Sequence, residues 1–157
     1  MKLCIKQAVF TWVDRFSITD EWGNERYYAE GEFFSWGKKL HVYDMQGKEI
    51  AFIEQKLFSF LPTYYIHAAG QESLSVVKEF TFFRPCYTIG GKDWTVEGEF
   101  WEHEYSVFDR KGIVFQISKE WFTWGDCYLL EIASPADELT ALCTALVIDC
   151  VTAQQND

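Results

Sequence analysis

The sequence has no excess of positive charge and no long apolar run. Its 157 residues include 14 Lys and Arg against 24 Asp and Glu, which gives a formal net charge of −10 at pH 7. Nucleic-acid binding needs a surplus of cations that neutralises phosphates, so this composition excludes a general nucleic-acid-binding protein. No segment offers the ~18 uncharged apolar residues of a membrane-spanning helix. Lysines within the first six residues interrupt any secretory signal, and we expect a cytoplasmic protein.

The sequence lacks any functional spacing of its cysteines. The five cysteines are odd in number, widely separated and free of any C-x-x-C pair: Cys4, Cys86, Cys127, Cys143 and Cys150. This spacing fits neither the usual zinc-ligand patterns nor a small domain held together by disulfides. We therefore expect five reduced thiols, which agrees with a reducing compartment.

The sequence also lacks the residue constellations that catalysis and cofactor binding need. Histidine occurs only at positions 41, 67 and 103, and no G-x-S-x-G, P-loop or H-E-x-x-H motif is present. The densest polar cluster is Glu102-His103-Glu104. If these residues lie on a strand, the carboxylates point away from the imidazole, because side chains alternate between the two faces. We therefore predict no catalytic residues, no metal site and no cofactor, and hence a protein that is not an enzyme.

What the sequence has in abundance is aromatic residues in a repeat. Phe, Tyr and Trp make up 18% of the chain and only 3 residues are proline, a composition that favours β-strands. An aromatic, then Ser or Thr, then an aromatic recurs at intervals of 22 to 24 residues. The copies lie at 10–12, 34–36, 58–60, 80–82 and, after a double interval, 122–124. Phe100–Tyr105 occupies the missing position as a degenerate sixth copy.

Glycine turns separate the copies. Gly23 and Gly47 each follow an Asp by three residues, which is typical of a type I turn closed by a residue of positive φ. Gly70, Gly91 and Gly112 recur more loosely at the same interval. These turns lack the alternating oxygen ligands of a calcium loop. Each unit therefore predicts strand, loop, strand and glycine turn, and six units predict about twelve antiparallel strands over residues 3–132.

The last segment breaks this pattern and predicts a helix over residues 135–153. Ser134-Pro135 is typical of a helix start, and residues 139–153 are apolar on every side apart from three threonines and Asp149. A helix of this kind is buried all round. Because twelve strands form a barrel too wide for strand side chains to fill, the helix must fill it. We predict one mainly β domain over 1–157, a closed antiparallel barrel around a central hydrophobic C-terminal helix.

Several of these motifs resemble a known family. The Phe-Ser-Trp-like units, Lys78–Phe83, Gly98–Tyr105 and the Val147-Ile148-Asp149 ending are similar, in the same order, to the bacterial YxjI-type branch of the LURP-one-related family. That family is grouped with the Tubby C-terminal domains and the phospholipid scramblases, whose shared fold is a twelve-stranded barrel around a hydrophobic helix. The resemblance implies the same architecture that the repeat predicts.

The resemblance implies a non-catalytic binding or adaptor domain whose partner is an unknown protein or lipid. Tubby domains bind phosphoinositides and scramblases move lipids, so the alternative that the resemblance offers is a peripheral lipid- or membrane-associated protein. The acidic calcium segment of the scramblases and a basic phosphoinositide cluster have no counterpart in this sequence. No functional residue is therefore carried over from the family.

A candidate binding site lies in the loops beside the aromatic motifs, where cations accompany the aromatics. The candidate anion- or lipid-binding residues are Trp36, Lys38, Lys39, Phe83, Arg84 and Trp124. Nearby carboxylates, among them Asp14 and Glu32, offset these cations. We expect the aromatics to fill the barrel end rather than to meet a membrane. Any membrane contact should be weak, confined to anionic vesicles and lost with added salt.

Overall fold

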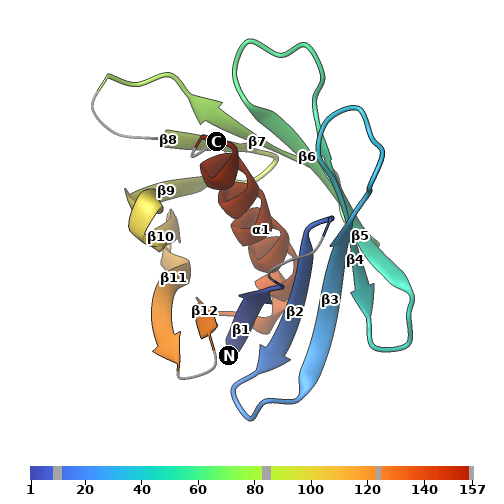
Figure 1. Ribbon diagram of the computed structural model, residues 1–157. Coiled ribbons are helices and arrows are strands. Elements are labelled where there is room, and N and C mark those ends of the chain that lie inside the picture. The colour runs from blue at the N-terminus through green and yellow to red at the C-terminus, as the bar shows by residue number, and fades with distance from the viewer. Residues whose placement is uncertain (9–11, 83–85, 123–124, 156–157) are drawn as a thin grey trace.

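The computed structural model describes residues 1–8, 12–82, 86–122 and 125–155. Over these residues, twelve strands follow one another in chain order around a closed barrel (Figure 1). Each strand is antiparallel to its neighbours, and the first pairs with the last. The strands are β1 (Lys2–Gln7), β2 (Arg15–Asp20), β3 (Glu25–Gly31), β4 (Lys39–Asp44), β5 (Glu49–Gln55), β6 (Thr63–Ala68), β7 (Leu74–Glu79), β8 (Cys86–Gly90), β9 (Trp94–Glu99), β10 (Glu104–Asp109), β11 (Gly112–Phe122) and β12 (Gly125–Ile132). The predicted antiparallel barrel is confirmed.

The connections between strands alternate between the two ends of the barrel, because neighbouring strands run in opposite directions. One end, which we call the turn end, holds the connections after β2, β4, β6, β8 and β10. The predicted glycine turns are found here. Gly47, for example, has φ +80° and donates its N–H to the Asp44 carbonyl at 3.0 Å. The other end, which we call the rim, is where β1, β3, β5, β7, β9 and β11 end, and it holds the described connections that follow them.

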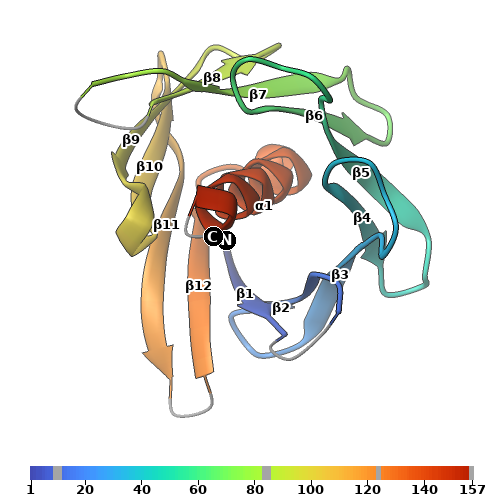
Figure 2. The ribbon, with the colours of Figure 1, turned by 45° about the horizontal axis from the view of Figure 1, so that its top comes forward.

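A helix fills the barrel. It is α1 (Glu138–Gln155), which follows a 3-10 turn at Pro135–Asp137 and runs inside the ring of strands (Figure 2). Every α1 residue from Thr140 to Ile148 is buried, so all sides of the helix face the barrel wall. Inward-facing strand residues such as Leu40 and Leu130 are fully buried around it. The predicted central hydrophobic helix is confirmed, and it ends two residues beyond the predicted boundary.

The polar groups of the helix have hydrogen-bond partners within the helix or on the barrel wall. The buried hydroxyls of Thr144 and Thr152 each donate to the backbone carbonyl four residues earlier, at 2.8 Å. A buried hydroxyl without a partner would destabilise the fold by about 1–3 kcal/mol. At the helix start, the Glu138 carboxylate accepts hydrogen bonds from the Tyr27 hydroxyl at 2.7 Å and from Arg26 at 3.2 Å. These bonds attach the helix start to β3.

The structure corrects the expectation of five free thiols. Cys4 on β1 and Cys127 on β12 form a disulfide, with Cα atoms 6.1 Å apart, a separation within the usual range for such bonds. The two cysteines are 123 residues apart in sequence and become neighbours because β12 pairs with β1. Cys86, Cys143 and Cys150 are free.

Candidate functional site at the barrel rim

The rim carries a set of large apolar side chains that are exposed to solvent. Trp36, Phe58 and Phe60 have exposed fractions of 84%, 101% and 97%. The rings of Phe33 and Phe34 contact each other edge to face, with centroids 4.4 Å apart. The full set lies on the connections after β1, β3, β5 and β7, and we call it the aromatic rim: Trp12, Phe33, Phe34, Trp36, Leu57, Phe58, Phe60, Phe80 and Phe82.

The aromatic motif divides its residues between solvent and core. The aromatics lie on the connection, and the large apolar residue that follows lies on the next strand and faces inward. Leu40 and Tyr64 are fully buried in this way, whereas Trp36 and Phe60 before them are exposed. The expectation that the aromatics fill the barrel end is therefore wrong for the described aromatics on the connections after β1, β3, β5 and β7, because α1 already occupies the interior. On the connection after β9 it holds, since Phe100 is buried there against Tyr87 and Tyr105.

The β3–β4 connection takes its shape from Gly37. This residue has φ +77°, and a Cβ there would lie 2.8 Å from Cδ2 of Leu57 on the β5–β6 connection, so only glycine fits without strain. The Ser35 hydroxyl donates to the Gly37 carbonyl at 2.6 Å, and the Lys38 backbone N–H donates to Oε1 of Gln55 at 3.0 Å. These contacts fix the turn from which the lysines and the exposed tryptophan of this connection project.

A polar pocket of about 380 Å³ opens beside the aromatic rim, between the connections after β1 and β3. Small-molecule sites in proteins have volumes of this order. The lining combines aromatic rings, two carboxylates, two ammonium groups and two amides, contributed by Trp12, Phe33, Asp14, Glu32, Lys38, Lys39, Gln55 and Gln154. The pocket therefore contains fixed charges of both signs.

Lys38 and Asp14 form a partly buried ion pair in this pocket, with about a quarter of each side chain exposed. Burial opposes the charged form of Lys38, but the hydrogen bond to Asp14, together with the charges of Asp14 and other nearby acidic groups, outweighs it and raises the pKa of the lysine. Lys38 is therefore held as a cation, and the Asp14 carboxylate already balances its charge.

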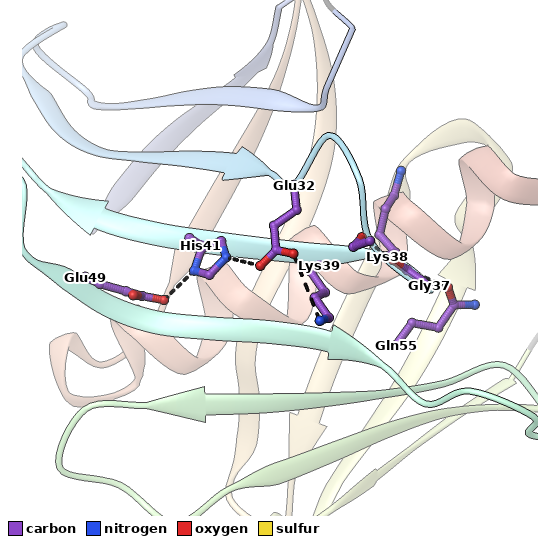
Figure 3. A network of polar contacts seen from close by, with 8 residues as sticks. Glu32, Gly37, Lys38, Lys39, His41, Glu49 and Gln55 are labelled. Atoms are coloured by element: carbon purple, nitrogen blue, oxygen red, sulfur yellow. Dashed lines mark hydrogen bonds and ion pairs between the residues drawn. The ribbon is translucent and has the colours of Figure 1, made fainter.

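Glu32 lies at the centre of a second set of contacts (Figure 3). Its Oε2 is 4.0 Å from Nζ of Lys39, an ion pair too long for a hydrogen bond. Its Oε1 is 2.8 Å from Nε2 of His41, and Nδ1 of His41 is 2.6 Å from Oε1 of Glu49. Burial opposes protonation of His41, but the hydrogen bonds to the two glutamates outweigh it and raise the pKa of the imidazole. His41 thus connects the pocket to Glu49 at the start of β5.

The structure places half of the predicted site residues. Lys38 and Lys39 both line the polar pocket. Trp36 belongs to the aromatic rim and is not part of the pocket lining. The other three predicted residues, Phe83, Arg84 and Trp124, lie outside the described residues.

Other residues of the pocket and its network were not predicted as site residues. Asp14 and Glu32 were expected only to offset the positive charge of the loops, whereas each faces one particular lysine. His41 and Gln154 carry no sequence signal that connects them to the lysines. Gln154 reaches the pocket because α1 ends at the rim, where the Tyr64 hydroxyl donates to its Oε1 at 3.1 Å.

The Glu102-His103-Glu104 cluster does not lie on one strand, which corrects the expectation above. His103 ends the 3-10 turn Phe100–Glu102 with φ 54°. Its Nε2 is 3.1 Å from Oδ1 of Asp149 on α1, and its ring stacks on Tyr128 with centroids 4.2 Å apart. The imidazole therefore ties the central helix to the barrel wall. In the described ranges, no three His, Cys, Asp or Glu side chains are grouped so that they could hold a metal ion.

The fold places this chain among barrels of consecutive antiparallel strands that enclose their own C-terminal helix. A model of the LURP-one-related family matches residues 1–149, and the chain belongs to that family. It is similar to the uncharacterised protein YxjI of Bacillus subtilis (strain 168), with 38% identity over 157 residues that cover 100% of this chain and 97% of that protein. An X-ray structure of a protein from Arabidopsis thaliana shares the fold, with a TM-score of 0.62 at 15% identity over 95% of this chain and 91% of that one. The family that the motifs resemble is confirmed.

Within the described residues, no helix has both the length and the apolar character needed to cross a membrane.

Proposed function

We propose that this chain is a non-catalytic binding domain that docks onto a lipid membrane surface through its aromatic rim. The observation that carries the proposal is the exposure of the rim, where large apolar side chains from four separate connections face solvent at one end of the barrel. Contiguous apolar groups that a soluble protein leaves exposed mark interaction sites.

The arrangement of these side chains fits a flat and laterally uniform target. The four connections follow one another around one barrel end, and each presents aromatic side chains at its tip. Trp36, Phe58 and Phe60 are at least 84% exposed, so each ring is available for shallow insertion. Aromatic side chains are favoured at the boundary between lipid headgroups and acyl chains. A membrane interface meets these conditions.

The two predicted anion-binding lysines do not favour an anionic surface, because Lys38 is paired with Asp14 and Lys39 faces Glu32. Insertion of rings is the stronger contribution. An aromatic side chain buries about 150–250 Å², so half-immersion at about 25 cal/mol per Å² stabilises binding by roughly 2–3 kcal/mol per ring. Membrane contact should then depend little on salt, in contrast to the salt-sensitive contact that the sequence led us to expect.

Vesicle flotation tests this proposal. The parent protein should float with neutral phosphatidylcholine vesicles at both low and physiological salt. The double variant Trp36→Ser with Phe58→Ser removes two inserted rings, and its partition should fall at least ~100-fold. Trp22→Ser is the matched control, because Trp22 is 77% exposed on the β2–β3 connection at the turn end. This control should float like the parent.

Two results would contradict the proposal. Vesicle binding that persists in the double variant would place the membrane contact elsewhere on the molecule. A parent that stays at the bottom of the gradient, together with a partner protein that binds the parent and not the double variant, would assign the rim to an adaptor function instead.

A further inference from the structure

The polar pocket shares Trp12 and Phe33 with the aromatic rim, and the charged and amide groups of its lining point to a ligand. We propose that the pocket binds a phosphate group joined by a short chain to an ammonium group, the chemistry of phosphocholine and phosphoethanolamine. The ligand is either free or the headgroup of a lipid. The lipid case rests on the proposed function, because rim docking brings the pocket opening to headgroup level, whereas the free ligand does not depend on it.

The charges of the pocket select a ligand that carries both signs. Lys38 and Asp14 already form a close ion pair, which leaves Glu32 and Lys39 as the pair that can accept a ligand. The Glu32 Oε2 and Lys39 Nζ atoms are 4.0 Å apart, and both side chains are 35% exposed. Each therefore retains hydrogen-bonding capacity that a ligand can use. A purely anionic ligand would meet as many carboxylates as ammonium groups, and selectivity of this kind comes from repulsion as well as attraction.

The pocket supplies suitable groups for each end of the ligand. The rings of Trp12 and Phe33 line it, and aromatic faces attract ammonium groups, quaternary ones included. The amide oxygens of Gln55 and Gln154 accept hydrogen bonds from the Lys38 backbone N–H and from a tyrosine hydroxyl. Their NH₂ groups would then serve as donors to the phosphate oxygens, beside the Lys39 ammonium group.

His41 is a positioning residue in this arrangement. It holds Oε1 of Glu32 at 2.8 Å, which leaves Oε2 facing Lys39. The volume of about 380 Å³ suits a small polar ligand rather than an acyl chain, since sites for drug-sized ligands start at about 300 Å³. Ligand ammonium would thus lie between Glu32 and the rings, and ligand phosphate at Lys39.

Calorimetric titration of the full chain with phosphocholine tests the pocket. The parent should bind phosphocholine, while inorganic phosphate alone and choline alone should each bind at least ~10-fold more weakly. Glu32→Gln and Lys39→Gln should each weaken phosphocholine binding about tenfold, because each removes one charge-assisted contact. Glu131→Gln is the matched control, since Glu131 forms an exposed 2.9 Å ion pair with Lys2 outside the pocket. It should bind like the parent.

Several outcomes would overturn the assignment: no heat of binding, phosphate that binds as tightly as phosphocholine, or equal loss in the control. Vesicles distinguish the two ligand sources. A preference for phosphatidylcholine over phosphatidylglycerol that Glu32→Gln abolishes supports a lipid headgroup, and phosphocholine binding without that preference supports the free ligand. Failure of the pocket can be told apart from failure of rim docking. If phosphocholine does not bind, but the parent floats with vesicles and the double variant Trp36→Ser with Phe58→Ser does not, the pocket proposal is wrong and the docking proposal stands.

Discussion

Shortening of Leu146 tests whether α1 is the core of the barrel. This side chain is 1% exposed and borders an interior space of about 10 Å³, hardly enough for one water molecule. Leu146→Ala removes buried apolar volume and leaves a cavity, which costs about 3–5 kcal/mol when the surroundings do not collapse. The hydrogen-bonded strands around the helix resist such collapse. We therefore expect the upper part of this range, a large share of the ~5–15 kcal/mol that stabilises a typical domain.

Urea unfolding, followed by tryptophan fluorescence and by circular dichroism, measures this loss. Leu139→Ala is the control, because it makes the same chemical change at a partly buried position of the same helix, and it should cost about half as much. Leu146→Met keeps the volume and should cost less than about 1.5 kcal/mol. If Leu146→Ala shifts the unfolding midpoint no more than Leu139→Ala does, the helix is not the core.

Two further predictions concern the outer face and the cysteines. The raised pKa of His41 means that protonation stabilises the folded state fully below the unfolded-state pKa of about 6.5, and this contribution disappears as pH rises through the higher folded-state pKa. The stability lost in His41→Gln should therefore be larger at pH 5.5 than at pH 9, and an equal loss at both would contradict the reasoning. Alkylation of the denatured, unreduced protein should label three thiols and leave Cys4 linked to Cys127. Five labelled thiols in the denatured protein would disprove the disulfide. In the native protein Cys86 alone should react, because burial raises the pKa of the Cys143 thiol to about 12 and Cys150 is buried as well.

The architecture could be predicted because each part follows from a local pattern. The aromatic motif and the glycine turn recur at one interval, so each repeat marks a pair of strands and the number of repeats sets the size of the barrel. The segment from Thr140 to Ile148 has no polar face, so a helix formed by it has to be buried on all sides. Both conclusions need only residues that are near one another in sequence.

The site could be predicted only in part, because it depends on contacts between distant segments. Lys38 and Lys39 stand out beside an aromatic motif, but Asp14 is 24 residues from Lys38 and on another connection. The same holds for Cys4 and Cys127, which meet only where the barrel closes. Whether an aromatic loop folds over a barrel end or faces solvent also has no local signal. The space that α1 leaves inside the barrel decides it: Phe100 is buried at the rim, whereas Trp36 is exposed.

The position of α1 at the end of the fold has a consequence for synthesis. Each strand pairs with the one before it, so hairpins can form as the chain emerges from the ribosome. Their apolar faces have nothing to pack against until residues 138–155 arrive, and β1 keeps an unpaired edge until β12 is made. Exposed apolar surface and free strand edges are what make incomplete chains aggregate. Nascent chains of this family should therefore depend on chaperones until the 18 residues of the central helix have been added.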